Sequence, residues 1–331
     1  MLSRVADSLY WMSRYLERAE HSARVINVQL NLMLERGAGS DDEYWARVLN
    51  SLGVQMAADE ATHAQTLAVS LVRDTAHRAS IVSSVIAARE NARQVREQIS
   101  SEMWEQLNRL FHSVRRAHSE AAWDAREFLQ SVKEGAHLFQ GITDSTMTHG
   151  EGWQFIQAGR FLERTVSVST LVGSFFRERP VASRSIPQSM LQSMKEEGDP
   201  EHLEWLGLLR SCTAFEAYCK AYTADLKPER VAEFLVLHPG FPHSIRFSAA
   251  ALEGAVKEIG GEARSRGKSR LERIAGRLHA TLSFGQIDEI MTSGLDAYLD
   301  TVLRQCGHVH SALYQTYIAY PIEAALGACS C

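Results

Sequence analysis

Residues 3–36 read SRVADSLYWMSRYLERAEHSARVINVQLNLMLER, and they predict one uninterrupted helix. With a turn of about 100° per residue, the apolar side chains from Val5 to Leu30 fall in a single stripe, which is typical of a helix packed on a core. Ser3 is a suitable N-cap, because its hydroxyl can accept a backbone N–H of the first turn. The segment 37–42, GAGSDD, ends this helix and caps the next one.

The rest of the chain continues the helical pattern. Its long segments are rich in Ala, Leu, Glu, Gln and Arg, and no run of alternating residues predicts a strand. The expected helices cover residues 41–52, 60–72, 79–99, 102–117, 120–140, 153–176, shorter pieces within 188–258, 268–282 and 286–318. Residues 141–152, which contain three glycines, are expected to form a loop. The predicted fold class is all-α, a multi-helix bundle.

The composition of the 331-residue chain excludes several classes of protein. With 45% hydrophobic and 23% charged residues it is not a disordered chain, and no stretch of about 18 uncharged apolar residues predicts a membrane helix. A net charge of −5 gives no general attraction to nucleic acid. The five cysteines form no CxxC pair and are odd in number, which argues against a disulfide framework. We therefore expect a soluble cytoplasmic protein that binds neither nucleic acid nor membrane.

One short motif occurs twice. Arg14–Arg18 reads RYLER and Arg160–Arg164 reads RFLER, at an offset of 146 residues, and each copy lies inside a long predicted helix. Chance and an old duplication both explain a match of this length. The chain is therefore predicted to be one helical domain over residues 1–331, with pseudo-repeated halves 1–149 and 150–331 as a hypothesis.

The two copies of the motif have different surroundings on the helical wheel. The charged side chains of 14–18 lie opposite the apolar stripe, where a solvated face is one interpretation. The helix around 160–164 is apolar almost all round, so its charges should be buried and must be paired. They form either a structural ion-pair network or an anion-binding interior, because the guanidinium group offers a planar donor fork.

Three further segments contain candidate polar groups. The segment 88–108 has the spacing of an ordinary helix with surface salt bridges. The hydroxyl-rich residues 143–146 either bind phosphate or cap the next helix. The basic run 264–277 is a solvated patch or a docking surface for an acidic partner or a phosphate-bearing ligand.

Sequence signatures of several known chemistries are absent. The chain contains no Walker A, GxGxxG, GxSxG or HExxH sequence. Its two ExxH matches, Glu60 to His63 and Glu134 to His137, are no more than chance predicts, so a di-metal site is not expected.

Five segments together resemble the alpha-E family, a bacterial all-helical family named for its Glu-Arg motif. They are YWMSRYLERAEHSARVI at 10–26, ARENARQVREQISSEMWEQLN at 88–108, GITDSTMTHGEGWQFIQAGRFLERT at 141–165, SCTAFEAYCKAY at 211–222 and AEFLVLHPGFPHSIRF at 232–247. Because they occur in order over most of the chain, the resemblance is specific. It implies a single helical domain of family length in a bacterial cytoplasm.

The resemblance also implies a partner, because proteins of this family occur beside, or fused to, a circularly permuted ATP-grasp protein. The implied role is amide or peptide bond formation, or peptide modification, on a small peptide or amino-acid substrate. ATP and Mg²⁺ would be bound by the ATP-grasp partner, and no cofactor is expected on the helical chain itself. The resemblance marks the following motif positions without assigning roles to them: Arg18, Glu20, Arg24, Glu90, Asn91, Arg93, Trp104, Asp144, Thr146, Trp153, Arg160, Glu163, Arg164, Glu216 and Tyr218.

Two functional hypotheses follow. In the first, the chain contributes an Arg/Glu-lined site to the ligase, with Glu163 or Glu90 as the general base that deprotonates the incoming amine. The substrate-binding candidates are Arg18, Arg24, Asn91, Arg93, Asp144, Thr146, Arg160, Arg164, Glu216 and Tyr218. In the second, the chain is a non-catalytic scaffold or docking subunit. The first hypothesis requires the charged side chains to converge in a wet, cation-rich chamber.

Overall fold

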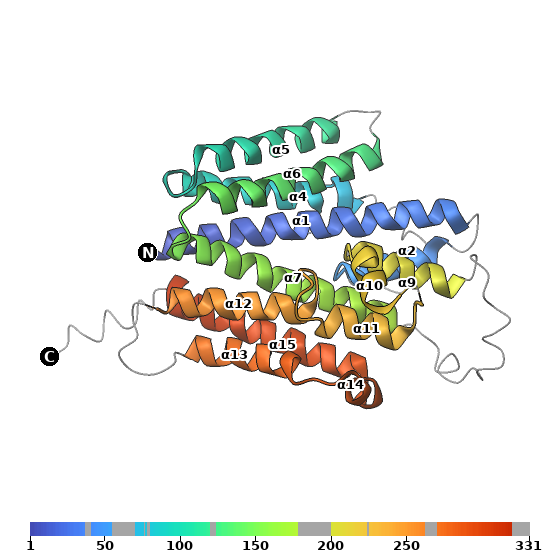
Figure 1. Cartoon of the computed structure of the whole chain (residues 1–331). Coiled ribbons are helices and arrows are strands. Elements are labelled where there is room, and N and C mark those ends of the chain that lie inside the picture. Colours follow the sequence, from blue (N-terminus) through green and yellow to red (C-terminus); the bar gives the residue numbers. More distant parts are fainter. Residues whose placement is uncertain are drawn as a thin grey trace, which may run out of the picture.

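The computed structural model describes residues 1–36, 41–54, 70–75, 77, 80–119, 124–177, 200–223, 225–261 and 270–319. Every regular element within these ranges is a helix, which confirms the predicted all-α bundle (Figure 1). Several predictions concern residues outside the described ranges. They are most of the helix expected at 60–72, the first part (188–199) of the segment expected to hold shorter helices, the pair Glu60 and His63, and the basic residues 264–268.

The helices form three layers in Figure 1, with α1 and α7 together in the middle. The helical elements are α1 (Ser3–Arg36), α2 (Asp41–Ser51), α4 (Ile81–Gln94), the 3-10 turn η2 (Arg96–Gln98), α5 (Ser101–Ser119), α6 (Ala125–Thr146), α7 (Glu151–Arg177), α9 (Pro200–Ser211), α10 (Phe215–Tyr222), α11 (Pro228–Leu237), α12 (Ile245–Ile259), α13 (Arg270–Ser283), α14 (Ile287–Ser293), α15 (Leu295–Leu313) and the π-turn η4 (Tyr314–Ile318). The layer of α4, α5 and α6 lies on one side of the central pair, and the layer of α12, α13 and α15 lies on the other.

The two central helices have neighbours in the same order. Helices α4 and α6 pack against α1, and α5 packs against both of them. Helices α12 and α15 pack against α7, and α13 packs against both of them. This shared order is what two pseudo-repeated halves would produce, and their common origin stays a prediction.

Polar side chains at helix starts explain where several helices begin. Ser80 caps α4 by accepting the N–H of Ser83 at 3.1 Å, and Ser244 caps α12 by accepting the N–H of Phe247 at 3.0 Å. Asp124 does the same for α6. Each cap satisfies a backbone donor that the first turn of a helix leaves unpaired.

Three predicted boundaries are wrong. The helix expected over 79–99 ends at Gln94 and is followed by the 3-10 turn η2. The loop expected from residue 141 is helical as far as Thr146, and the hydroxyl groups of Thr143, Ser145 and Thr146 donate to carbonyls four residues earlier in α6. The single helix expected over 286–318 is divided at Gly294, whose φ of 101° lies in a region that favours glycine. At residues 141–146 and at Gly294, the observed conformation differs from the one that the average propensity of the segment predicts.

Helices α1 and α7 run in the same direction and approach each other closely at Gly159. The amino group of Met1 lies 2.9 Å from the carboxylate of Glu151, so the two helices start side by side. A Cβ atom at position 159 would overlap the backbone carbonyl of Tyr10 and the hydroxyl of Ser13. Glycine at this position therefore allows the two central helices to touch.

We expect Gly159→Ala to lower the free energy of unfolding by about 1–3 kcal/mol, because the overlapping Tyr10 carbonyl belongs to the backbone and cannot move alone. The matched control is Gly254→Ala in α12, where a Cβ atom meets nothing within 4 Å. Alanine favours a helix, so the control should keep or slightly raise stability. Urea unfolding checks both variants, and equal stabilities would contradict the close approach.

Candidate functional site

The two copies of the RxxER motif bind each other across the interface of α1 and α7. Glu163 of α7 accepts hydrogen bonds from Nε of Arg14 at 2.7 Å and from Nε of Arg18 at 2.6 Å, both from α1. Glu17 of α1 in turn accepts from Nε of Arg164 at 2.5 Å and from its Nη2 at 3.0 Å. Each carboxylate is therefore neutralised by arginine from the other copy.

This arginine–glutamate cluster, formed by residues 14, 17, 18, 160, 163 and 164, is buried except for Arg18 and Arg160, which are partly exposed. Glu17 is 2% exposed and Glu163 is 3% exposed. The interpretation of residues 14–18 as a solvated face is wrong, because α7 covers the polar side of α1. Helix α1 packs against α4 and α6 as well as against α7, so both its apolar stripe and its charged face are buried.

The arginines keep both carboxyl groups ionised. Burial alone would raise the pKa of Glu163, but Arg14 and Arg18 outweigh it and hold that pKa below its ordinary value. Burial opposes ionisation of Glu17 as well, and Arg164 and Arg160 lower its pKa. A general base works best when its pKa is close to the working pH, so these two carboxylates are poorly suited to proton abstraction.

Further polar groups lie next to the cluster, near Arg164. Nη1 of Arg164 donates to the carbonyl of Pro242 at 3.2 Å, in the loop before α12. Arg24 forms an ion pair with Glu20, and its Nη2 lies 3.1 Å from Nε2 of His137 on α6. The buried imidazole of His21 and the half-buried imidazole of His243 also lie here. Burial lowers the pKa of His21 to about 4, and it lowers that of His243 well below the ordinary value.

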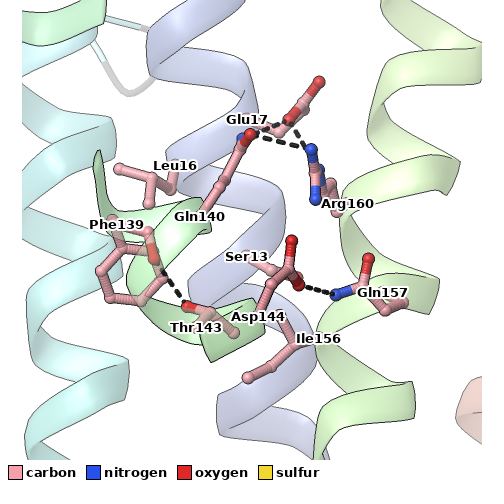
Figure 2. A pocket seen from close by; sticks show the side chains of 10 residues that line it. All are labelled: Ser13, Leu16, Glu17, Phe139, Gln140, Thr143, Asp144, Ile156, Gln157 and Arg160. Atoms are coloured by element: carbon pink, nitrogen blue, oxygen red, sulfur yellow. Dashed lines mark hydrogen bonds and ion pairs between the residues drawn. The ribbon is translucent and has the colours of Figure 1, made fainter. Parts of the chain in front are cut away.

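A small pocket opens beside Arg160, between α1, α6 and α7 (Figure 2). Nη2 of Arg160 donates to Gln140 at 2.8 Å, while its Nε has no hydrogen-bond acceptor among the described residues. Asp144 also lines the pocket and accepts from Trp153 at 3.3 Å and from Gln157 at 3.5 Å.

The volume of this pocket is about 20 Å³, which is enough for one water molecule. Of the predicted site residues, Arg18, Arg160, Glu163 and Arg164 therefore converge, but the space between them is filled with side chains. The cluster is not a wet chamber that could hold a substrate.

The family model for "a predicted alpha-helical domain with a conserved ER motif" matches residues 1–318. The chain belongs to the Alpha-E family. Uncharacterized proteins of Mycobacterium bovis and Mycobacterium tuberculosis are similar to it, at 24% and 23% identity over 337 residues, which include 94% of this chain. The chain spans only 35% of the length of these relatives. No solved structure matches it.

Several candidate residues of this Alpha-E chain lie apart from the cluster. Glu90 is on an exposed part of α4, where it accepts from Arg89 at 2.8 Å and from Arg93 at 2.9 Å. Asn91 donates to Ala87 of its own helix. Glu90 lines a different pocket, together with Phe111 and Arg115 of α5.

The remaining candidates have local roles. Thr146 exchanges a hydrogen bond with Ser100 at 2.8 Å near the surface. Glu216 is exposed on α10. Tyr218, on the same helix, is buried and donates to the carbonyl of Asp225 at 2.7 Å. None of the contacts described for these residues joins them to the arginine–glutamate cluster.

The structure adds members that were not selected as site residues from the sequence. Arg14 and Glu17 complete the ion pairs, and Gln140 binds both Glu17 and Arg160. The repeat itself was the available signal, because Arg14 corresponds to Arg160 and Glu17 to Glu163 at the offset of 146 residues. Gln140 had no such signal.

Within the described ranges, neither a metal-ion site nor a membrane-spanning helix is found. No group of three or more His, Cys, Asp or Glu side chains there is arranged to hold a metal ion. None of the helices in these ranges combines the length and the apolar character that crossing a bilayer requires.

Proposed function

We propose that this Alpha-E chain is a helical partner module of a circularly permuted ATP-grasp ligase, which docks that protein and leaves the amide-forming chemistry to it. The observation that supports this role is the mutual neutralisation of the two motifs. The guanidinium groups of Arg14 and Arg164 already bind carboxylates, a tyrosine hydroxyl and a backbone carbonyl, so few donors remain for an anionic substrate.

The length of the relatives supports the proposal that this chain is a module that works beside another protein or domain. The matched region takes up 35% of their length, so in those chains an Alpha-E domain is covalently linked to a much longer polypeptide. A rigid core is well suited to a docking role, because interlocked buried ion pairs favour one arrangement of the two central helices.

Arg160 supports a second candidate function, in which the chain lends a binding group to the substrate of the ligase. Unlike that of Arg164, its Nε is buried without a hydrogen-bond acceptor among the described residues and lies 3.9 Å from a carboxylate oxygen of Glu17, while the side chain lines a pocket that also contains Asp144. A partner that closed over this pocket would bring a carboxylate or phosphate within reach of a partly free guanidinium group.

The test is reconstitution with a circularly permuted ATP-grasp protein of the same genome. We expect a complex on size exclusion and ATP-dependent product formation that requires the helical chain, with Arg160→Gln and Asp144→Asn both retaining complex and turnover. Loss of turnover in Arg160→Gln with an unchanged melting temperature and an intact complex would select the second candidate. Failure to form a complex at any salt concentration would overturn the partner role.

A further inference from the structure

A larger pocket lies on another side of the molecule, where α10, α11, α12 and α14 meet. Its volume is about 430 Å³, within the range of about 300–1,000 Å³ that is typical of small-molecule sites. It is lined by Tyr222, Glu233, Leu237, His238, Pro239, Arg246, Gly285, Gln286, Ile287 and Asp288. We call it the α11–α14 pocket.

The α11–α14 pocket contains charges of both signs on separate elements. Glu233 of α11 and Asp288 of α14 are acidic, and Arg246 of α12 is basic. Nη1 of Arg246 donates to the carbonyl of Leu237 at 3.3 Å, which positions the guanidinium group at the pocket wall. The side chain of Tyr222 interacts with the Glu233 carboxylate.

The walls between these charges are partly apolar, because Leu237, Pro239 and Ile287 also line the pocket. A site with two acids, one arginine and an apolar wall fits a small molecule with an ammonium group, a carboxylate and a hydrocarbon part. A bare metal ion fits less well, since the described residues contain no group of three His, Cys, Asp or Glu side chains suited to hold one.

We infer that the α11–α14 pocket binds a free amino acid or a dipeptide as a zwitterion, with the ammonium group at Glu233 and Asp288 and the carboxylate at Arg246. The guanidinium fork of arginine suits a carboxylate, and the two acids suit an ammonium group. The inference does not depend on the proposed docking function, because none of the pocket residues belongs to the arginine–glutamate cluster.

The test is titration calorimetry of the whole chain with the standard free L-amino acids and with glycyl dipeptides of the same series. At least one of them should bind with a Kd of about 1 mM or tighter. Its N-acetyl form, which lacks the ammonium group, and its methyl ester, which lacks the carboxylate, should each bind at least fivefold more weakly. Absence of binding by every probe overturns the inference.

Variants assign the binding to this pocket. Asp288→Lys should abolish binding and Arg246→Gln should weaken it at least fivefold, while the matched control Glu289→Gln, at an exposed acid outside the pocket lining, should bind normally. Asp288 is exposed, so Asp288→Lys should keep the melting temperature of the parent protein. Equal affinity of the parent and Asp288→Lys would overturn the assignment, whatever the behaviour of Arg246→Gln.

Discussion

Glu163→Gln should lower the free energy of unfolding by about 3–5 kcal/mol, because two arginines of α1 lose the buried carboxylate that binds them both. Glutamine keeps the size of the side chain and can still accept hydrogen bonds, so the loss reports mainly on charge. Urea unfolding at pH 7 measures it. The effect is large because taking a guanidinium group out of water is unfavourable unless an opposite charge compensates it.

The matched control is Glu90→Gln on α4. Glu90 is also bound by two arginines, Arg89 and Arg93, but its side chain is 43% exposed. Water screens exposed ion pairs, so this variant should lose no more than about 1 kcal/mol. If the two variants lost equal stability, the cluster would not be the stabilising core that the structure indicates.

Lowering the pH from 7 to 4 should destabilise the protein by about 3 kcal/mol through His21 alone. Burial disfavours the charged imidazole and lowers the pKa of His21 to about 4, against an ordinary value near 6.5. Between these two values the unfolded chain takes up a proton that the folded chain does not. Stability should therefore be complete above about pH 6.5 and should fall steadily toward pH 4.

The measurement is the free energy of unfolding at several values between pH 7 and pH 4. His21→Gln should reduce the slope in this window, and His308→Gln, at an exposed position of α15, is the control. His243 has a lowered pKa for the same reason, so part of the slope should remain in His21→Gln. A slope that is the same in the parent and in His21→Gln would show that this histidine is not buried in its neutral form.

Much of the fold could be predicted because helix formation depends on nearby residues. The periodicity of residues 3–36 predicted α1 with its observed bounds, and the apolar character around 160–164 correctly predicted that those charges are buried. One error arose at Gly294, where a single glycine divides two helices, and another at residues 141–146, where α6 continues through a hydroxyl-rich segment. Average propensity is a weak guide at such positions.

The candidate site was harder to predict than the fold. On the helical wheel, residues 14–18 have the pattern of a surface, since their charges lie opposite an apolar stripe. Only the packing of α7 against α1 buries them. Glu90 and Arg93 have the same residue types as the cluster and even the same ion pairing, yet they remain near water. Residue type and spacing therefore did not distinguish a buried charge from an exposed one.

The amino-acid sequence by itself determined that the chain is helical, the approximate bounds of α1, α2, α5, α7 and α13, and that an RxxER motif occurs twice. Tertiary structure alone decided that Glu17 binds Arg164, that Glu163 binds Arg14 and Arg18, and that little open space remains between them. The physical reason is distance along the chain. Hydrogen bonds within a helix join residues four apart, whereas these ion pairs join residues nearly 150 apart and exist only once α7 lies against α1.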